Sequence, residues 1–521
     1  MANKTDIPNV RLPLAASYNT RGQNGISTAV TRATDQRKIN SMYQMINNAA
    51  TGAASLKLVK RPGTVYNAST FGLSTQYAQL GTQDASQNPV LFTTAGQSIP
   101  TDVIVKGAAG ATSTLIAASN YLPRYCDRAF ITGTETMIVQ LVYTDTVRHR
   151  IFYGTAAAGP WTEITDANFV TFLNRGKMEF MDGWAFIMTS DNKVINLDLN
   201  SLSVMTNTNQ FYRKQIEQDV PQGLAKLGNQ LLAFGLETME VFVNGGVATG
   251  SPLTPVKQLA QRVGIPSTGY LGGFGSTSTH YYAVVGKKLY FVGNIAADTN
   301  VASTAFYVYD GSEVTKVSTP NIDAFLNGQT AYSVSRVNVM GRTAIAVGLT
   351  NWQSASAYWL MYFPDVNEWF EWTSSVFQPT NNDAYFLGVG NTASANKLQS
   401  FSALDYGSEP YNVWNDGATS GVQGSGTSFQ WAHQFKLPTD GNQRKQHKWV
   451  ALVGDTARAA QDIDVSVSDD DYQTWTSLGT IDMTSDKKAL YRLGGFNQRA
   501  IRLSYTGSLG VDLTQFLSRI E

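Results

Sequence analysis

The sequence is poor in cysteine and in charge. Cys126 is the only cysteine among 521 residues, so a disulfide within one chain and a cluster of thiolate metal ligands are both excluded. This scarcity predicts folding in a reducing cytoplasm. Charged residues make up only 15% of the chain, and 39 Lys and Arg balance 39 Asp and Glu. Without a net charge, no general field draws the protein to nucleic acid or to an anionic membrane.

Membrane and export signals are also missing. The sequence has no run of about eighteen apolar residues of the kind that spans a membrane. Its first residues, MANKTDIPNVRLPLAAS, lack the basic and apolar regions of a secretory leader. We therefore expect a protein that is made in the cytoplasm and is soluble or joins an assembly.

Short apolar or aromatic runs separated by turn residues fill the chain from residue 131 to about 420. In FYVYDGSEVTKVSTP, residues 306–320, an aromatic run is followed by the turn dipeptide Asp310-Gly311 and a second apolar run. Turn signals at intervals of about eight to twelve residues are typical of all-β folds. So many hairpins are too many for one sandwich and favour a β-propeller, with about six or seven blades.

The other segments differ in composition and predict separate parts. Residues 1–63 are polar and predict an N-terminal arm, of which residues 1–35 are ordered only by a partner. Residues 64–130, rich in Ala, Ser and Thr, predict a β segment or insertion whose strands join the propeller at 131–420. After a Gly/Ser-rich linker, residues 421–521 predict a C-terminal β-sandwich-like domain.

Motifs of common catalytic and phosphate-binding sites are missing from the sequence. No GxSxG elbow or GK[ST] phosphate loop occurs, and the glycines of GYLGGFG, residues 269–275, predict a propeller loop. The four histidines have no metal-ligand spacing and are expected to be exposed or capping residues: His149, His280, His433 and His447. We therefore expect no catalytic, cofactor-binding or metal-binding site, and a protein that is not an enzyme.

One short motif has both a structural and a functional interpretation. SDDDYQTW, residues 468–475, resembles the Asp box of sialidases, SxDxGxTW, in which Asp470 would accept hydrogen bonds from turn amides and Trp475 would pack under the hairpin. Tyr472 stands where the box has glycine, which departs from the pattern. The motif predicts a hairpin, and a solvated turn is favoured over a Ca²⁺ site in its three acids.

Two further clusters are interpreted as structural. The basic residues Arg444, Lys445, His447 and Lys448 predict a charged loop in solvent; a phosphate or an acidic partner is the less favoured alternative because no aromatic platform is interleaved. Trp369 and Trp372 alternate with acids along a predicted strand, which favours core packing over a sugar platform.

Seven segments occur in a fixed order and carry a resemblance. They are LVKRPG (58–63), ITDANFVTFLNRGKMEFMDGWAFI (164–187), NQLLAFGLETMEVFVNGG (229–246), PLTPVKQLAQRVGIPST (252–268), KKLYFVGN (287–294), FYVYDGSEVTKVSTPNIDAFL (306–326) and YWLMYFPDVNEWFEWTS (358–374). Together they resemble the tail hub, or nozzle, of short-tailed bacteriophages (podoviruses), a family also called packaged-DNA stabilisation proteins. The likeness covers roughly residues 36–375.

The resemblance implies a β-propeller subunit of a homo-oligomeric ring, usually a hexamer, in the virion tail. Such a ring lies below the portal and its head-tail adaptor, extends the channel for double-stranded DNA, helps to retain and then conduct the DNA, and docks tail fibres, spikes or a tail needle. A near-neutral chain fits a channel through which DNA slides, because many phosphate contacts would hold it. A propeller glycoside hydrolase, sialidase-like, and a cellular propeller scaffold stay open as alternatives; the first needs paired carboxylates.

Overall fold

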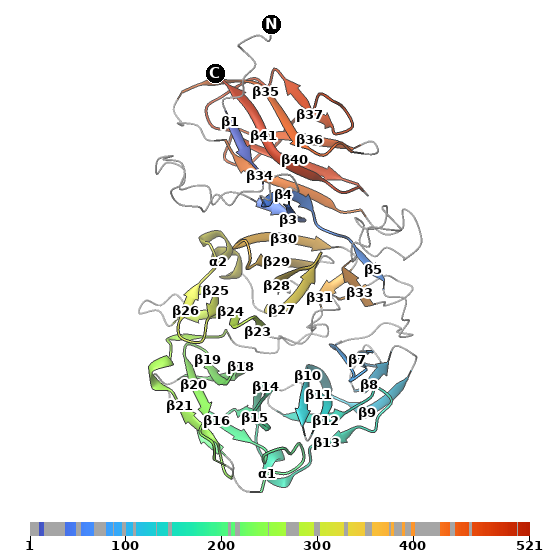
Figure 1. Ribbon diagram of the computed structural model, residues 1–521, viewed down its shortest axis with the longest axis vertical. Helices are drawn as coiled ribbons and strands as arrows, with labels where there is room; N and C mark the ends of the chain where they lie inside the picture. The colour runs from blue at the N-terminus through green and yellow to red at the C-terminus, as the bar shows by residue number, and fades with distance from the viewer. Residues whose placement is uncertain are drawn as a thin grey trace. The chain divides into compact units, whose positions relative to one another are not determined.

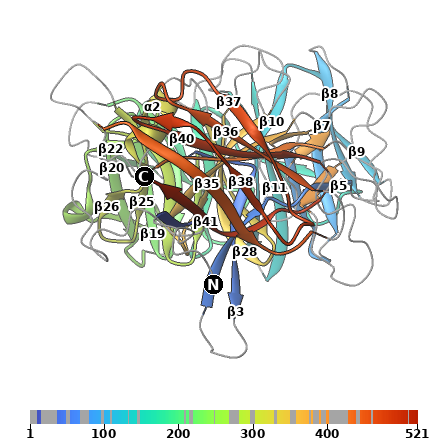
Figure 2. The ribbon, with the colours of Figure 1, turned by 90° about the horizontal axis from the view of Figure 1, so that it is seen from above.

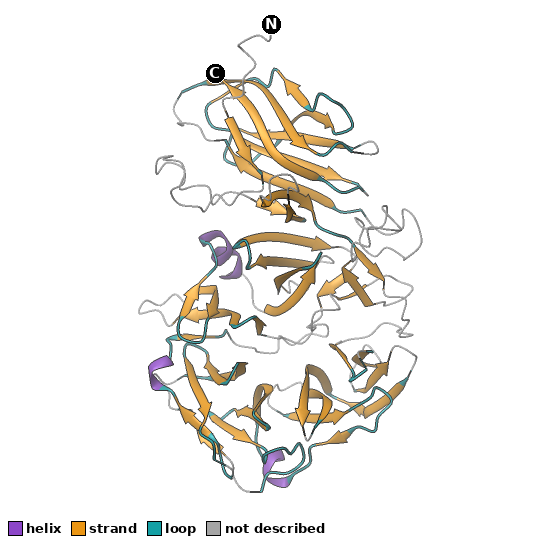
Figure 3. Ribbon diagram, in the orientation of Figure 1, coloured by secondary structure: helices purple, strands orange, loops and turns teal. Residues whose placement is uncertain are grey.

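The structure, a computed structural model, is nearly all β (Figures 1 and 3). It describes residues 10–14, 37–47, 54–66, 80–86, 88–95, 100–107, 111–131, 133–143, 148–206, 210–213, 219–247, 249–266, 281–295, 303–327, 332–349, 357–374, 377–379, 388–390, 398–401, 428–437, 443–457, 461–507 and 509–521. The chain divides into two compact units. Unit 1 comprises Met1–Tyr66, Tyr358–Ser374 and Phe401–Glu521, and unit 2 comprises Asn67–Ala357 and Ser375–Ser400. Among the described residues, no helix is long and apolar enough to cross a membrane.

Unit 2 is a series of antiparallel sheets whose strands follow one another in the chain. The strands are β6 (Leu80–Gln83), β7 (Pro89–Thr94), β8 (Thr101–Gly107), β9 (Thr112–Ser119), β10 (Tyr121–Ile131), β11 (Thr134–Tyr143), β12 (His149–Gly154), β13 (Thr162–Glu163), β14 (Asn174–Met181), β15 (Trp184–Thr189), β16 (Lys193–Asn196), β17 (Gln210–Tyr212), β18 (Pro221–Leu227), β19 (Gln230–Gly235), β20 (Met239–Asn244), β21 (Leu253–Pro255), β22 (Val263–Gly264), β23 (Tyr282–Val285), β24 (Lys288–Ile295), β25 (Ser303–Tyr309), β26 (Val314–Lys316), β27 (Tyr332–Val339), β28 (Arg342–Leu349), β31 (Phe377–Pro379), β32 (Gly388–Gly390) and β33 (Leu398–Phe401). The described residues of this unit also include the short helices α1 (Ala167–Val170), η3 (Lys257–Leu259) and α2 (Pro320–Asn327).

The strand order identifies the fold of unit 2. Strands β6–β9, β10–β13, β14–β17, β18–β21 and β22–β26 each form one sheet, and β27–β28 and β31–β33 are further antiparallel groups (Figure 1). Sheets of about four strands repeated in series are the blades of a β-propeller. The predicted propeller is confirmed, and the number of blades stays a prediction.

Successive sheets pack face to face, as propeller blades do. Neighbouring residues of a strand point to opposite faces of its sheet. In β11, Val139 packs in one apolar cluster with residues of β7 and β8, while Ile138 packs in another with residues of β15 and β16. In β15, Ile187 shares the cluster of Ile138, whereas Phe186 packs against β19 and β20. The β10–β13 and β14–β17 sheets are therefore covered on both faces, which explains their strongly apolar strands.

Unit 1 contains two sheets built from three stretches of the chain. Its strands are β1 (Val10–Pro13), β2 (Arg37–Ile39), β3 (Ser41–Asn47), β4 (Ala54–Lys60), β5 (Thr64–Tyr66), β29 (Ala357–Phe363), β30 (Glu368–Ser374), β34 (Gln430–Lys436), β35 (Lys445–Gly454), β36 (Asp462–Ser468), β37 (Thr476–Asp482), β38 (Ala489–Tyr491), β39 (Gly495–Phe496), β40 (Ala500–Thr506) and β41 (Asp512–Ile520). One sheet has the order β3-β4-β41-β35-β38, with β1 also on β41 and β39 also on β35, and the other includes β29-β30-β2-β34-β40-β36-β37.

The two sheets of unit 1 form the predicted β-sandwich-like domain. Figure 2 separates β36, β37 and β40 of one sheet from β35, β38 and β41 of the other. Phe435 and Phe516 meet between the sheets, with ring centroids 5.0 Å apart in an edge-to-face arrangement. The sandwich also contains N-terminal strands, which the prediction for residues 421–521 did not include.

Strands β1 to β4 come from the segment that was expected to be an arm. Val10–Pro13 pairs with β41 of the same chain, and β3 pairs with β4. The side chains of Leu12 and Leu14 are buried. In the single chain, β1 therefore packs without a partner, because its apolar side chains are covered by the same chain; that a partner orders residues 1–35 stays a prediction for the assembly. The rest of residues 1–35 lies outside the described residues.

The strand predicted to carry Trp369 and Trp372 is present as β30, which pairs with β29. Trp372 is fully buried, as its core interpretation predicts, and Trp369 is half-buried with its ring 4.9 Å from that of Tyr362. In the division of the chain into compact units, the β29–β30 hairpin belongs to unit 1. The reason is a set of hydrogen bonds from the N-terminal strands to its last residues.

Arg61 is the centre of these bonds and is fully buried. Its guanidinium donates to Asn40 Oδ1 at 2.9 Å and to the Thr373 carbonyl at 2.8 Å. It also lies 3.7 Å from the ring centroid of Phe429. Trp372 Nε1 donates to the Ser41 carbonyl at 2.7 Å. Arg61 thus joins the N-terminal, middle and C-terminal segments of unit 1, and we call these residues the Arg61 network.

Replacing Arg61 by Met tests the importance of the Arg61 network. The Arg61→Met variant removes the guanidinium donors from the Pro62 and Thr373 carbonyls, while Asn40 Oδ1 keeps the Thr373 amide, so we expect unit 1 to lose about 3 kcal/mol of unfolding free energy. Urea denaturation followed by tryptophan fluorescence measures the loss. The matched control is Arg128→Met, which removes only the half-exposed ion pair with Glu135 and should cost less than about 1 kcal/mol. Equal losses in the two variants would contradict the prediction.

Candidate functional site

A bulge in β14 shapes a polar part of the interior of unit 2. The pairing of β14 with β15 shifts register between Arg175 and Glu179. Gly176 lies in the bulge with φ +68°, and a Cβ atom added there would lie 2.6 Å from Gly223 Cα of β18. Only glycine fits so close an approach of two backbones.

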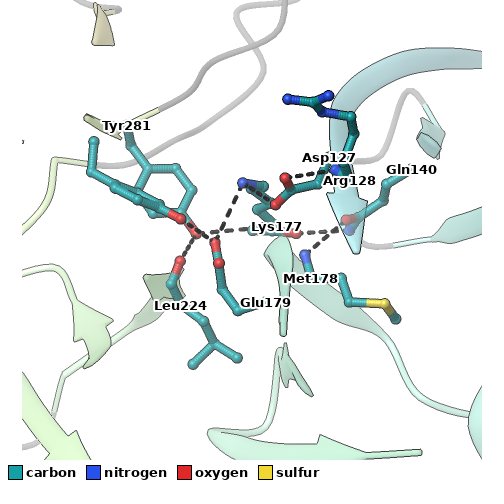
Figure 4. Close-up of polar contacts among 10 residues, drawn as sticks. Asp127, Arg128, Gln140, Lys177, Met178, Glu179, Leu224 and Tyr281 are labelled. Atoms are coloured by element: carbon teal, nitrogen blue, oxygen red, sulfur yellow. Dashed lines mark hydrogen bonds and ion pairs between the residues drawn. The ribbon is translucent and has the colours of Figure 1, made fainter. Parts of the chain in front are cut away.

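Side chains from two other strands hold the bulge in place (Figure 4). Gln140 of β11 donates through Nε2 to the Gly176 carbonyl at 2.7 Å, and its Oε1 accepts from the Met178 amide at 3.0 Å. On the other side, the hydroxyl of Tyr281 donates to the Leu224 carbonyl and accepts from the Lys177 amide at 3.4 Å. The backbone on both sides of Lys177 is therefore fixed.

The fixed bulge brings Lys177 against two carboxylates. Its ammonium lies 2.6 Å from Asp127 Oδ2 of β10 and 3.7 Å from Glu179 Oε1. The hydroxyl of Tyr282 donates to Glu179 Oε1 at 2.5 Å. The side chain of Glu179 is 4% exposed and that of Asp127 is 28% exposed, so one carboxylate is buried and the other reaches solvent. We call Asp127, Lys177, Glu179 and Tyr282 the central cluster.

Burial and charge shift the pKa values in the central cluster in opposite ways. Burial raises the pKa of Glu179 to about 7, although Lys177 counteracts the shift. Burial alone would lower the pKa of Lys177, but Asp127 and Glu179 outweigh it and raise this pKa well above its usual value. Burial, together with Glu179, raises the pKa of Tyr282. Glu179 therefore exchanges its proton near neutral pH while Lys177 stays charged.

This arrangement defines what chemistry the central cluster can supply. A carboxyl that is half protonated near pH 7 is suited to proton donation. The oxygens of Asp127 and Glu179 that contact one nitrogen at 2.6 and 3.7 Å are too close for the roughly 6.5–9.5 Å spacing of inverting glycosidases. Lys177 lies between them. Within the described part of the chain, no group of three or more His, Cys, Asp or Glu side chains is placed to hold a metal ion.

Two of the three histidines in the described part of the chain are buried rather than exposed or capping. Burial lowers the pKa of His433 to about 3 and that of His447 to about 4, so both are neutral in the folded chain. The exposed or capping interpretation is wrong for these two, because both rings face the interior of unit 1. His149 is half-buried, and its ring contacts the Gln140 amide. His280 and the glycines at 269–275 lie outside the described residues.

The Asp-box-like motif forms the predicted hairpin between β36 and β37. Asp470 accepts from the Thr474 amide at 3.0 Å and from Ser468 Oγ at 2.7 Å. The Thr474 hydroxyl also donates to Asp470 and has the largest effect. Together these hydrogen bonds lower the pKa of Asp470 to about 2. Tyr472 has φ +71°, the left-handed conformation that glycine provides in the box. Tyrosine therefore keeps the turn geometry at the expense of backbone strain.

The predicted basic loop is a strand with a buried histidine. Lys445 begins β35, and His447 Nε2 contacts Ser518 Oγ at 2.8 Å in the interior. Lys448 lies 3.4 Å from a carboxylate oxygen of Glu521. The solvated-loop interpretation is wrong for His447, because the run alternates sides along β35. His447 faces the interior, so it does not share a solvent-exposed surface with Lys448.

Sequence reasoning did not single out the central cluster. Lys177 and Glu179 stand two residues apart in RGKMEFMDG, which places them on one face of a strand. Asp127 and Tyr282 are separated from them by 50 and more residues, and no local pattern links them. The useful local signal was Gly176 directly before Lys177, because an isolated glycine within a strand indicates a bulge.

Comparisons with known proteins return similarity in solved structures only. No family model matches the chain, and no curated protein matches it. The β-propeller domain of the Trilobed protease from Pyrococcus furiosus is 9% identical, with 62% of this chain and 94% of that chain covered and a TM-score of 0.34. An exo-β-1,3-galactanase from Phanerochaete chrysosporium is 10% identical over 88% of this chain and 100% of that chain, with a TM-score of 0.27. An α-L-arabinanase from Penicillium chrysogenum is 9% identical over 66% and 97%, with a TM-score of 0.31.

These comparisons correct one expectation from the sequence. We expected a protein that is not an enzyme, and the solved structures similar to the chain include glycoside hydrolases. An absence of catalytic activity is therefore not retained. Identities of about 10% and TM-scores below 0.5 describe the fold and do not assign a reaction to this chain.

The buried carboxyl of Glu179 should make stability depend on pH. Its pKa is about 7 in the folded chain and lies near 4.5 when unfolded, so the folded state binds the proton more tightly. This stabilisation is full below about pH 4.5 and is lost as pH rises to about 7. The melting temperature of the wild type should therefore fall between pH 5 and pH 8, and that of the Glu179→Gln variant should fall by less. Thermal denaturation at several pH values measures the difference.

The control for this experiment is Glu163→Gln. Glu163 pairs with Arg150 at a half-exposed site outside the central cluster. Its variant should keep the pH dependence of the wild type. If Glu179→Gln also keeps that pH dependence, the raised pKa of Glu179 is not its cause.

Proposed function

We propose that this protein is a structural subunit of the virion tail of a short-tailed bacteriophage, the tail hub or nozzle. In this function it forms a ring below the portal and its adaptor, extends the channel for double-stranded DNA and helps to retain packaged DNA. It conducts the DNA at ejection and docks fibres or spikes. The confirmed β-propeller fold is compatible with this proposal, since rigid blades with short, protected edges are suited to ring assembly.

The observation that supports the proposal is the Arg61 network. Two of the resembling segments, residues 58–63 and residues 358–374, are far apart in sequence. Arg61 of the first donates to the Thr373 carbonyl of the second at 2.8 Å. Segments that carry a family likeness in a fixed order thus also meet in one buried set of contacts. Such joint packing is expected if the likeness reflects a shared architecture rather than chance matches.

Identical subunits around one channel need head-to-tail contacts that close after a fixed rotation. A formal charge balance of 39 basic and 39 acidic residues suits a DNA channel, since few net phosphate contacts let DNA pass. The partners in this function are further copies of the chain, the head-tail adaptor, and a fibre, spike or needle. Its location is the virion tail, after assembly in the host cytoplasm.

The ring is the testable consequence of the hub function. Native mass spectrometry of the full chain, at rising concentration, should find a closed oligomer, most often a hexamer. Negative-stain images of the same sample should show rings with a central hole. A stable monomer or a two-fold dimer under these conditions would contradict the proposal.

A second candidate function, a glycoside hydrolase of the propeller type, is favoured by the central cluster. Glu179, with its pKa of about 7, would donate the proton, and Asp127, which reaches solvent, would be the second carboxylate. The short spacing of the two acids fits a retaining mechanism better than an inverting one. The position of Lys177 between them requires that its ammonium move away before a sugar enters.

Hydrolysis of β-1,3-galactan, arabinan and sialosides by the purified chain tests this second function. Reducing-sugar release should fall at least about a hundredfold in Asp127→Asn and in Glu179→Gln. Glu163→Gln, outside the central cluster, should keep full activity. No release from any substrate, or release unchanged in both site variants, would exclude the central cluster as the active site.

A further inference from the structure

Strand β1 is held in unit 1 by few contacts. It is four residues long, and Val10–Pro13 pairs with residues 515–518 of β41. The backbone amide of Leu14 donates to the Thr514 carbonyl at 3.0 Å, and Leu12 and Leu14 are buried. Four paired residues and two buried leucines are the contacts that hold β1 at this sheet edge.

The edge that receives β1 is complete only when β1 is present. One side of β41 is paired with β35 along its length. On its other side, β4 pairs with Leu513 and Asp512 only, and β1 pairs with residues 515–518. If β1 were removed, the backbone groups of residues 515–518 on that side would lose their partners. An open strand edge of this kind accepts another strand readily.

The segment that connects β1 to β2 is long. Residues 15–36 separate β1 from β2, and 22 residues span at most about 75 Å when extended. A connection of this length allows β1 to pair with the β41 edge of a neighbouring copy that lies within that distance.

We propose that in the assembled ring β1 of each subunit completes the β41 edge of the next copy of this chain. The acceptor is identical in every copy, so the exchanged strand makes the same backbone bonds and buries the same two leucines. The contacts that are lost within one chain are replaced by the same contacts between two chains. The exchange therefore links each subunit to its neighbour. This proposal rests on the ring of the proposed function and names the surface and the partner that link its subunits.

Engineered cysteines distinguish exchange from pairing within one chain. Arg11 and Leu517 are facing residues of β1 and β41. Facing residues of antiparallel strands have Cα atoms about 4.5–5.5 Å apart, which a disulfide spans. The native Cys126 is buried and can stay in place. The variants are Arg11→Cys, Leu517→Cys and the double variant, each made in the full chain.

The mixed sample is the decisive one. When chains with Arg11→Cys and chains with Leu517→Cys assemble together and are oxidised, exchange predicts covalent dimers on non-reducing denaturing gels. The double variant should give a ladder of covalent oligomers. No crosslink in the mixture, together with a double variant that runs as a single chain, overturns the exchange. Absence of a disulfide in every sample overturns the pairing and with it the proposal.

A control and a second measurement complete the test. Asp462 and Asp482 face each other on β36 and β37, and both are exposed. Cysteines at these two positions should link only within one chain. Native mass spectrometry of the same samples separates the two proposals. A ring with β1 crosslinked only within each chain overturns the exchange and leaves the hub function standing, whereas a monomer overturns both.

Discussion

The burial of one guanidinium decides how unit 1 is built. A fully buried arginine must find acceptors for its donors, and Arg61 finds them on Asn40 and on the Thr373 carbonyl. Its aromatic neighbour Phe429 comes from the C-terminal stretch. Because these partners come from three parts of the chain, unit 1 cannot satisfy Arg61 until all three are in place. The β29–β30 hairpin is consequently part of the sandwich unit and not an independent element.

In unit 2, buried backbone groups are paired around the bulge of β14, whereas in unit 1 they are paired with the Arg61 guanidinium. Gly176 lets β14 approach β18, and Gln140 and Tyr281 form hydrogen bonds with the buried Gly176 carbonyl and the Lys177 and Met178 amides of the bulge. The same bulge presents Lys177 to Asp127 and Glu179, so the ionic cluster depends on the backbone irregularity. A structural role for the cluster and a chemical role both use this geometry. They differ in whether Lys177 stays between the two acids.

The sequence predicted those features that depend on neighbouring residues. Asp310-Gly311 predicts its turn because the left-handed conformation of Gly311, φ +101°, is a local property, and the repetition of such turns predicts the propeller class. Features that depend on distant partners were missed. His433 and His447 look polar in sequence, yet both are buried. The bond from Arg61 to Thr373 spans 312 residues, and no local pattern encodes it. The central cluster was missed for the same reason, since three strands contribute to it.

The discontinuous make-up of unit 1 has a consequence for synthesis on the ribosome. Most of unit 2 is one uninterrupted stretch, Asn67–Ala357, so it can fold as it emerges. Strands β3 and β4 emerge before it but must wait for β41, whose residues follow roughly 20–90 s later at a usual translation rate of about 5–20 residues per second. During that time, Met42, Leu58 and Val59, which end up fully buried, have no sheet to cover them. The nascent chain is thus most prone to aggregation while its propeller is already formed, and slower translation would lengthen that period.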